Sequence, residues 1–269
     1  MYVPTGTIDL SNTDAIQDNF KIAIVSPPGE GKSWLAASCA TPEEPAFVWD
    51  FDGRRQSIAG KSNVHVKTIQ DVNYPTLMPT SWQTYLTDIM GFENAKARGE
   101  EIPKWFIPDS ATYMSEAALH YIMYNSPSLR REIRAGASIT YVPKGFDTYK
   151  AEIAEVIGAL QRLFCLGNVI MTFHIGAEKA PDSTQDNPKF TGKYTVTPPR
   201  YADLLALFND QWRVKAIGPQ QYEVQTQPSW DFVAKTTLNI DATTQPNIRQ
   251  MLQAHMTKKS NKSLPKATA

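Results

Sequence analysis

Short apolar runs alternate with amphipathic stretches along the first two thirds of the chain. The runs that predict strands span residues 21–26, 46–52, 64–69, 104–109 and 168–174. Between these runs, apolar residues recur at helical spacing, which predicts helices over 31–40, 81–92, 111–124 and 147–166. Strands that alternate with helices are typical of an α/β fold with a doubly wound, mostly parallel sheet.

The pattern changes in the last third of the chain. Residues 211–218 and 221–227 flank "PQ" and predict an antiparallel hairpin, so we expect a C-terminal antiparallel β extension of the sheet. A short helix is predicted to follow over 247–256. The chain therefore divides into a polar N-terminal segment, a core that includes the hairpin, and a basic flexible tail, with the bounds 1–19, 20–256 and 257–269.

Two polar stretches are too long to be ordinary connections. They span 126–146 and 175–199, and loops of this length in a compact domain are usually functional or disordered. We interpret both as long mobile loops.

The 269 residues carry 27 Lys and Arg against 27 Asp and Glu. This balance gives no bulk electrostatic footprint for nucleic acid, so any such contact must come from local basic clusters. Cys39 and Cys165 both fall in apolar helical patterns and are interpreted as reduced core residues. The chain starts with polar residues, and no apolar run has the length of a bilayer span, so we expect a soluble, cytoplasmic protein without a membrane partner.

The stretch "SPPGEGKS" (26–33) lies between the first predicted strand and the first predicted helix. A strand, a glycine-containing loop that ends in Gly-Lys-Ser, and a helix form a geometry that binds phosphate through backbone N–H groups. Lys32 is expected to reach the β- and γ-phosphates, and the Ser33 hydroxyl to bind Mg²⁺. Ser26 replaces the usual first glycine at a position that only starts the turn. The predicted nucleotide-binding residues are Pro28, Gly29, Glu30, Gly31, Lys32, Ser33 and Trp34.

A carboxylate at the tip of a neighbouring strand holds the metal in sites of this kind. Asp109 ends the run 104–109 and is the predicted Mg²⁺ ligand, together with Ser33. The alternative is that Asp109 only caps the helix that follows. Pro108 lacks a ladder donor, so we expect it to mark the end of strand pairing.

Hydrolysis also requires a group that orients the attacking water. Ser110 follows the metal ligand, where many related enzymes have Glu, so this group must lie elsewhere. Asp50 and Asp52 alternate onto one face of the run 46–52. Asp52 is nearer the carboxyl end and is the predicted base, the alternative being an ordinary loop aspartate before Gly53.

His174 ends the apolar run 168–174. A polar residue at the carboxyl end of a buried strand can touch the γ-phosphate or the attacking water, although a lone histidine can also be purely structural. His174 therefore joins Asp52 and Lys32 as a predicted catalytic residue.

The phosphate loop and the strand ends "VWDFDG", "WFIPDS" and "NVIMTFH", with the closing "WDFVAKTTLNI", resemble phage-encoded RecA-like P-loop ATPases in order and spacing. Among these the chain is similar to the Sak-type single-strand annealing proteins and related phage AAA-domain nucleotide-binding proteins, over residues 20–255. It departs from them at Ser26, Pro108 and Asp52, where Asp replaces Glu. The shorter carboxylate reaches less far toward water, which favours slow turnover.

The resemblance implies a RecA-like core that binds ATP and Mg²⁺, engages single-stranded DNA in recombination or annealing, and hydrolyses ATP with stimulation by DNA. It also implies a homo-oligomeric ring or filament with the nucleotide between subunits. In such assemblies a basic pair on a strand can reach the neighbour's γ-phosphate, and Arg213 and Lys215 have the required spacing. Two solvated strand charges are the alternative interpretation of this pair.

The resemblance further implies that DNA contacts lie in the two long loops. Cations track phosphates and aromatic rings stack on bases, so basic residues interleaved with aromatics suit a single strand. For the arginine cluster, an ordinary solvated helix face is the alternative. The predicted contacts are Arg130, Arg131, Arg134, Lys144, Lys179, Lys189 and Lys193.

A second hypothesis is a nucleotide-gated scaffold or loader with little turnover, which acts through a protein partner such as a single-strand-binding protein. A small-molecule kinase is disfavoured because no Arg-rich lid segment lies between the later strands. Stimulation of hydrolysis by DNA would separate the first hypothesis from the others.

Overall fold

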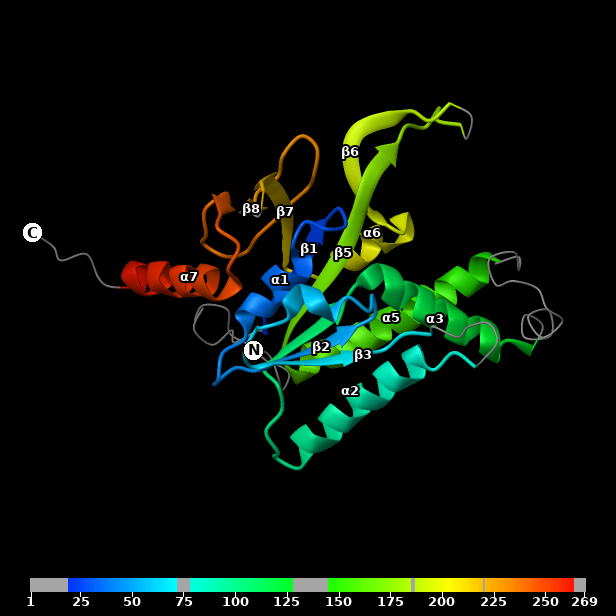
Figure 1. Cartoon of the computed structure of the whole chain (residues 1–269), viewed down its shortest axis with the longest axis horizontal. Coiled ribbons are helices and arrows are strands. Elements are labelled where there is room, and N and C mark those ends of the chain that lie inside the picture. The colour runs from blue at the N-terminus through cyan, green and yellow to red at the C-terminus, as the bar shows by residue number, and fades with distance from the viewer. Residues whose placement is uncertain (1–18, 72–77, 128–144, 185–186, 220, 264–269) are drawn as a thin grey trace, which may run out of the picture.

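The computed structural model describes residues 19–71, 78–127, 145–184, 187–219 and 221–263 (Figure 1). In this described part, one sheet has the strand order β3-β2-β4-β5-β1-β7-β8-β9, and β6 pairs with β5. The strands are β1 (Lys21–Ser26), β2 (Ala46–Asp50), β3 (Val64–Thr68), β4 (Trp105–Asp109), β5 (Asn168–Lys179), β6 (Phe190–Thr197), β7 (Asp210–Gly218), β8 (Gln221–Gln225) and β9 (Thr243–Thr244). Strands β1 to β5 and β7 pair in parallel, whereas β6, β8 and β9 pair antiparallel to their neighbours. The predicted α/β class, with a doubly wound parallel sheet and a C-terminal antiparallel extension, is confirmed.

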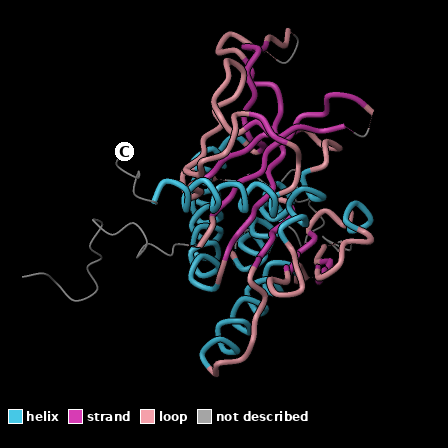
Figure 2. Tube along the Cα trace, turned by 90° about the vertical axis from the view of Figure 1, so that its left-hand side faces the viewer, coloured by secondary structure: helices cyan, strands magenta, loops and turns pink. Residues whose placement is uncertain are grey.

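Helices cover both faces of the sheet, as the turned view in Figure 2 shows. One face carries α2 (Ser81–Ala97), α3 (Ala111–Asn125) and α5 (Phe146–Leu166), and the other carries α1 (Lys32–Ala36) and α7 (Ile248–Ser263). Short helical turns complete the set, namely η2 (Ala37–Cys39), η3 (Arg55–Ile58), η4 (Pro199–Tyr201) and α6 (Ala202–Leu205). Within the residues described, none of these helices combines the length and apolarity needed to cross a bilayer.

Strand β1 lies at the centre of the fold because both of its faces are buried. Ile22 and Ile24 belong to the apolar cluster under α1 and α7, whereas Ala23 and Val25 belong to the cluster under α2, α3 and α5. A strand covered on both faces reads as a continuous apolar run, which explains why β1 was recognisable from sequence. The segment that leaves its carboxyl end is therefore held on a rigid base.

Pro108 lies in an interior strand without breaking the sheet. It is in register with Trp49 of β2, and the pairing of β4 with β5 covers Trp105 and Phe106 only. The expectation that Pro108 marks the end of strand pairing is therefore wrong toward β2, where pairing continues to Asp109. Toward β5, pairing has already ended at Phe106, so the missing N–H donor has no consequence there.

The second predicted loop, 175–199, is in fact an antiparallel hairpin. Strand β5 continues past His174 to Lys179, and β6 returns along it (Figure 1). The Thr, Tyr and Val residues of "FTGKYTVT" favour strand geometry, and this outweighs the polar composition from which a loop was predicted. We call residues 175–197 the arm, because Figure 1 shows this hairpin extending away from the body of the fold.

Two other expectations change. Cys39 is buried, but Cys165 is exposed, so the prediction that both are core residues is wrong for Cys165.

The helix α7 continues to Ser263 into the segment predicted to be a flexible tail, and the Lys258 amine pairs with Asp241 at 3.2 Å. Lysines near a helix C-terminus complement its dipole, which favours this extension. The polar segment 1–18 lies outside the described residues.

A buried carboxylate ties the base of the arm to the helical layer. Glu152 on α5 is fully buried and accepts hydrogen bonds from Tyr201 Oη at 2.8 Å, Arg200 Nε at 3.0 Å and Ser115 Oγ. Removing one member of a buried, charged hydrogen-bond network leaves the remaining polar groups buried without a partner.

We predict that Glu152→Ala lowers the free energy of unfolding by about 3 kcal/mol, because three donors and one charge lose their acceptor. Chemical denaturation measures this value, with Glu116→Ala on the exposed side of α3 as the matched control. Equal stability of the two variants would show that the buried carboxylate is not a structural tie.

Candidate functional site

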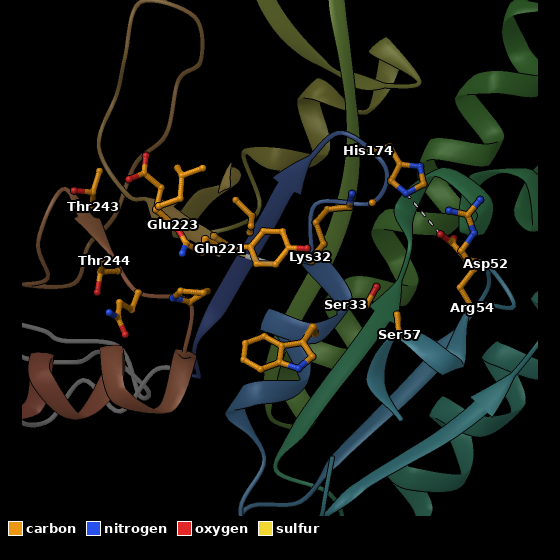
Figure 3. A pocket seen from close by; sticks show the side chains of 18 residues that line it. Lys32, Ser33, Asp52, Arg54, Ser57, His174, Gln221, Glu223, Thr243 and Thr244 are labelled. Atoms are coloured by element: carbon orange, nitrogen blue, oxygen red, sulfur yellow. Dashed lines mark ion pairs between the residues drawn. The ribbon is translucent and has the colours of Figure 1, made fainter. Parts of the chain in front are cut away.

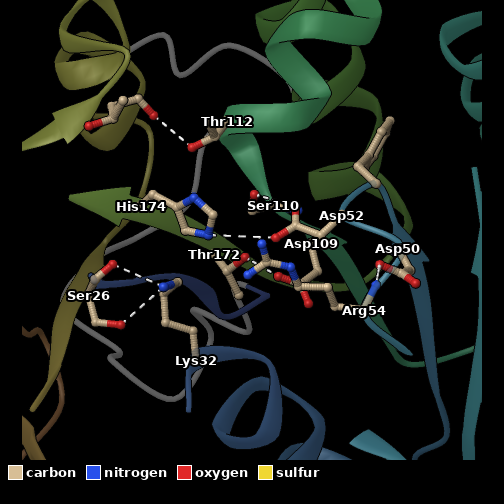
Figure 4. Close-up of polar contacts among 12 residues, drawn as sticks. Ser26, Lys32, Asp50, Asp52, Arg54, Asp109, Ser110, Thr112, Thr172 and His174 are labelled. Atoms are coloured by element: carbon tan, nitrogen blue, oxygen red, sulfur yellow. Dashed lines mark hydrogen bonds and ion pairs between the residues drawn. The ribbon is translucent and has the colours of Figure 1, made fainter. Parts of the chain in front are cut away.

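The phosphate loop leaves the carboxyl end of β1 and leads into α1. Lys32 is buried, and its Nζ donates to Ser26 O at 2.9 Å, Ser26 Oγ at 3.1 Å and Pro27 O at 2.9 Å. The loop therefore closes around the amine, as Figure 4 shows for Ser26 and Lys32. Ser26 is more than a tolerated replacement for glycine, because its hydroxyl adds an acceptor that a glycine cannot supply.

Gly31 is the point where the loop turns into the helix. Its φ of +81° lies in the left-handed region, and a side chain there would meet the ring of Tyr222 at 3.5 Å. The 3.5 Å is an ordinary van der Waals distance, so it is the φ angle that favours glycine, which adopts it without strain because it lacks a Cβ atom. Tyr222 on β8 thus covers the phosphate loop from the side of the C-terminal hairpin.

Asp109, the predicted metal ligand, lies at the tip of β4 beside the loop. Its carboxylate accepts hydrogen bonds from the hydroxyls of Ser33 and Thr172, and no side-chain bond from it caps α3. Burial raises the pKa of Asp109, and these two hydrogen bonds oppose the rise. A hydroxyl and a carboxylate are the hard oxygen donors that Mg²⁺ takes from P-loop proteins, and phosphates and water supply its other ligands. Ser33 and Asp109 therefore fit a magnesium ion.

Asp52 and His174 face each other across the same end of the sheet. Asp52 Oδ1 accepts from the backbone N–H of Ser110 at 3.2 Å and from its Oγ at 2.8 Å. The other carboxylate oxygen, Oδ2, lies 3.6 Å from His174 Nε2 (Figures 3 and 4). Asp50, by contrast, turns away and accepts the backbone N–H groups of Arg54 and Arg55, so it shapes the turn after β2.

Burial sets the charges of this pair. It raises the pKa of Asp52 to about 6, and the nearby Asp109 carboxylate adds to the rise. It lowers the pKa of His174 to about 4, with help from the positive charge of Lys32. At neutral pH the pair is therefore a carboxylate beside a neutral imidazole, which suits a general base and a hydrogen-bonding partner for water. The same burial lowers the pKa of Lys32 to about 8.

Lys32, Ser33, Asp52 and His174 line one cavity of about 990 Å³ (Figure 3). One side carries the phosphate loop with Asp52 and His174, and the other side is formed by the C-terminal strands. A cavity of this size is typical of a small-molecule site. The lining on the C-terminal side consists of Val214, Ile217, Gln221, Tyr222, Glu223, Thr243, Thr244, Gln245 and Pro246.

The structure brings most of the predicted nucleotide residues together. Gly29, Gly31, Lys32, Ser33 and Trp34 line the cavity. Pro28 and Glu30 do not line it, although they lie in the same loop. Glu30 instead receives a backbone hydrogen bond from Ala216 of β7, and its burial raises its pKa.

Arg213, the first residue of the predicted basic pair on β7, points into the protein. Arg213 Nη1 lies 2.5 Å from Asp231 Oδ2, and the side chain is only 7% exposed. Its guanidinium also stacks on the ring of Tyr194 at 4.5 Å. Lys215 is partly exposed. Contact of this pair with a neighbouring chain stays a prediction, and Arg213 would have to leave Asp231 to make it.

The predicted nucleic-acid residues fall in two groups. Lys179, Lys189 and Lys193 lie exposed on the arm, and Lys189 pairs with Asp182 at 2.5 Å. The others, Arg130, Arg131, Arg134 and Lys144, lie outside the described residues.

Sequence reasoning assigned no role in the site to four side chains that the structure places there, namely those of Ser26, Arg54, Thr172 and Tyr222. Thr172 had a signal, because it lies two residues before His174 and so shares its side of β5. Tyr222 had none, since its place over the loop depends on how the C-terminal hairpin packs.

Comparison with known proteins places this site in a family. A family model described as an AAA domain matches residues 18–238, which include the phosphate loop, Asp52, Asp109 and His174. No curated protein matches the chain. Among solved structures, the chain is similar to the X-ray structure of the Legionella pneumophila ATPase DotB, with 14% sequence identity and a TM-score of 0.20. That similarity covers 76% of this chain and 52% of the other, so the chain spans about half the length of that structure. Because the family match extends over most of its length, the chain belongs to the AAA-domain family and carries a P-loop ATPase domain.

Proposed function

We propose that this chain hydrolyses ATP and uses the nucleotide to control its grip on single-stranded DNA during recombination or annealing. The observation that carries the proposal is the continuity of β5. This strand presents His174 to Asp52 and then continues, without interruption, into the arm.

The chemical step is direct transfer of the γ-phosphoryl group to water. A bond forms between the water oxygen and the γ-phosphorus, and the bond from that phosphorus to the bridging oxygen breaks. ADP leaves with the electron pair, and Asp52 takes the proton. The distance of 3.6 Å between Asp52 Oδ2 and His174 Nε2 supports a water-binding role. Both atoms face one site, and they lie too far apart to form a hydrogen bond with each other.

The remaining groups hold the phosphates. Lys32 would exchange its loop acceptors for the β- and γ-phosphates, and the loop N–H groups would bind the same anion. A magnesium ion on Ser33 and Asp109 would supply positive charge at the phosphoryl oxygens. The cavity side that carries Tyr222, Thr243 and Thr244 would receive the nucleoside.

The arm is tied to the nucleotide site at two points. His174 is in register with Thr197 of β6, and Thr112 Oγ1 donates to Thr197 O at 2.7 Å. Thr112 follows closely after Ser110, which holds Asp52. The site of the γ-phosphate is thus connected to the base of the arm by a short path of covalent bonds and hydrogen bonds.

The outer part of the arm has the chemistry of a single-strand site. Lys179 lies directly opposite Phe190 in the register, and the Phe190 side chain is 55% exposed. Residues opposite each other in an antiparallel pair share one face, so a cation and an aromatic ring are presented together. We propose that this face binds the DNA backbone and bases, within a homo-oligomer in which Lys215 faces the adjoining subunit.

Equilibrium binding to a fluorescent single-stranded oligonucleotide tests the arm. We expect tighter binding with a non-hydrolysable ATP analogue than with ADP, because the γ-phosphate reaches the His174 end of the arm. Lys179→Ala and Lys193→Ala should each weaken binding and lower the salt slope by about 1, whereas the exposed Lys104→Ala, at the opposite end of the sheet, should not. Unchanged binding by both arm variants would place the DNA site elsewhere or favour the scaffold function.

A further inference from the structure

Arg54 follows β2 at the edge of the catalytic cavity, and sequence reasoning assigned it no role. It lines the cavity together with Lys32, Ser33, Asp52 and His174. Figure 3 shows its side chain beside Asp52, and Figure 4 shows it extending past Asp109 toward Thr172. An arginine is thus aimed at the place where the terminal phosphate must lie between the loop and the base.

The turn that carries Arg54 is held firmly. The Asp50 carboxylate accepts the backbone N–H groups of Arg54 and Arg55, both at 3.0 Å. Gly53, just before Arg54, has a φ of +69°, a backbone conformation that glycine adopts without strain. The backbone therefore leaves little freedom in the position of the Arg54 Cα, which favours a preorganised role.

The guanidinium itself is available. Across the residues that the structure describes, no carboxylate lies within ion-pair distance of Arg54. Its positive charge is nevertheless felt inside the site, where it helps to lower the pKa of His174 and opposes the raised pKa of Asp52. Arg213, the arginine that the sequence favoured for phosphate contact, is instead committed to Asp231.

We propose that Arg54 contacts the γ-phosphate bound by its own subunit and stabilises the negative charge that spreads over the phosphoryl oxygens during transfer to water. This rests on the proposed ATP hydrolysis and adds a residue to it. Arg54 neither gains nor loses a proton in the step. Lys32 holds the phosphates from the loop side, and Arg54 holds the same group from the β2 side. The planar guanidinium suits this task because it can donate two parallel hydrogen bonds to one phosphate.

A comparison of Arg54→Ala with Arg55→Ala tests the role. Arg55 is the adjacent exposed arginine, and its side chain does not line the cavity. We expect Arg54→Ala to lower kcat by about 10³-fold, which is the smallest effect typical of arginines that stabilise the transition state of phosphoryl transfer. Arg55→Ala should leave kcat unchanged. Arg54→Lys should restore little, since an ammonium cannot make the paired bonds.

Equilibrium binding gives a readout that does not depend on turnover. In Arg54→Ala the affinity for ATP should fall about 10-fold relative to the affinity for ADP, because only ATP has the γ-phosphate. An unchanged ratio would overturn the proposal even if the chain hydrolysed no ATP. Conversely, a lowered ratio in a protein without turnover would support the Arg54 contact and reject the proposed hydrolysis, so the two failures are distinguishable.

Mixing two inactive variants separates contact within a subunit from contact between subunits. Arg54→Ala retains the loop lysine, and Lys32→Ala retains Arg54. If Arg54 acts within its own subunit, the mixture stays inactive. Recovery of turnover on mixing would show that Arg54 serves a neighbouring subunit and would overturn the proposal.

Discussion

The Lys32→Ala variant is expected to lose ATP hydrolysis, with kcat/KM lowered by at least about 10³-fold. Lys32 Nζ is buried in the loop on three oxygen acceptors, at the one end of β1 where the cavity opens. Alanine would remove the only positively charged side chain of the loop 26–33, and the loop would also lose the bonds that keep it closed. Steady-state turnover and equilibrium nucleotide binding measure the two consequences.

A matched control separates this effect from misfolding. Lys61 lies over the exposed ring of Trp34 at 3.5 Å, outside the loop, and Lys61→Ala should leave hydrolysis within a few-fold of the wild type. Both variants should unfold cooperatively, with a lower melting temperature for Lys32→Ala because the loop loses the three hydrogen bonds of the buried amine. Normal turnover by Lys32→Ala would mean that the loop is not the phosphate site.

Asp52→Asn should lower kcat by about 10²- to 10⁴-fold while ATP binding persists. The amide oxygen can still accept the two bonds from Ser110, so the local geometry is preserved, but it cannot take a proton from water. Asp52→Glu should remain active, because it keeps the carboxylate and extends its reach. If Asp52→Asn and the wild type turned over equally, another group would have to be the base.

The pH profile gives an independent test of the same residue. The raised pKa of Asp52, about 6, means that the base is protonated below that pH, so kcat/KM should rise with pH through about 6. The lowered pKa of Lys32, about 8, predicts a decline at higher pH as its charge is lost. His174, with a pKa of about 4, stays neutral across this range. In Asp52→Asn the acidic limb should disappear.

The fold could be predicted because its strands are buried on both faces. The runs that became β1, β2 and β4 are nearly continuous in apolar residues, and parallel strands covered by helices have this signature. The site followed from the fold, since the carboxyl ends of parallel strands meet at one edge of the sheet. Lys32, Asp52, Asp109 and His174 come together for this reason.

What could not be predicted depends on packing rather than on local pattern. The arm was interpreted as a loop because its residues are polar, yet a hairpin that projects from the body needs few buried side chains. Cys165 was placed in the core because it falls in an apolar helical pattern. Leu163 and Leu166 of that pattern are buried, but Cys165 falls on the opposite side of α5. Arg54 was overlooked because the turn that carries it is held by Asp50, whose bonds to the Arg54 and Arg55 N–H groups arise only in the folded chain.

ATP turnover with and without single-stranded DNA is the most direct test of the central claim, which is that the nucleotide site and the arm work together. The account predicts that DNA raises turnover in the wild type, and that this stimulation is weakened in the Lys179→Ala and Lys193→Ala double variant while basal turnover persists. Turnover that is indifferent to DNA would contradict the coupling through β5 and would favour a nucleotide-gated scaffold that acts on a protein partner.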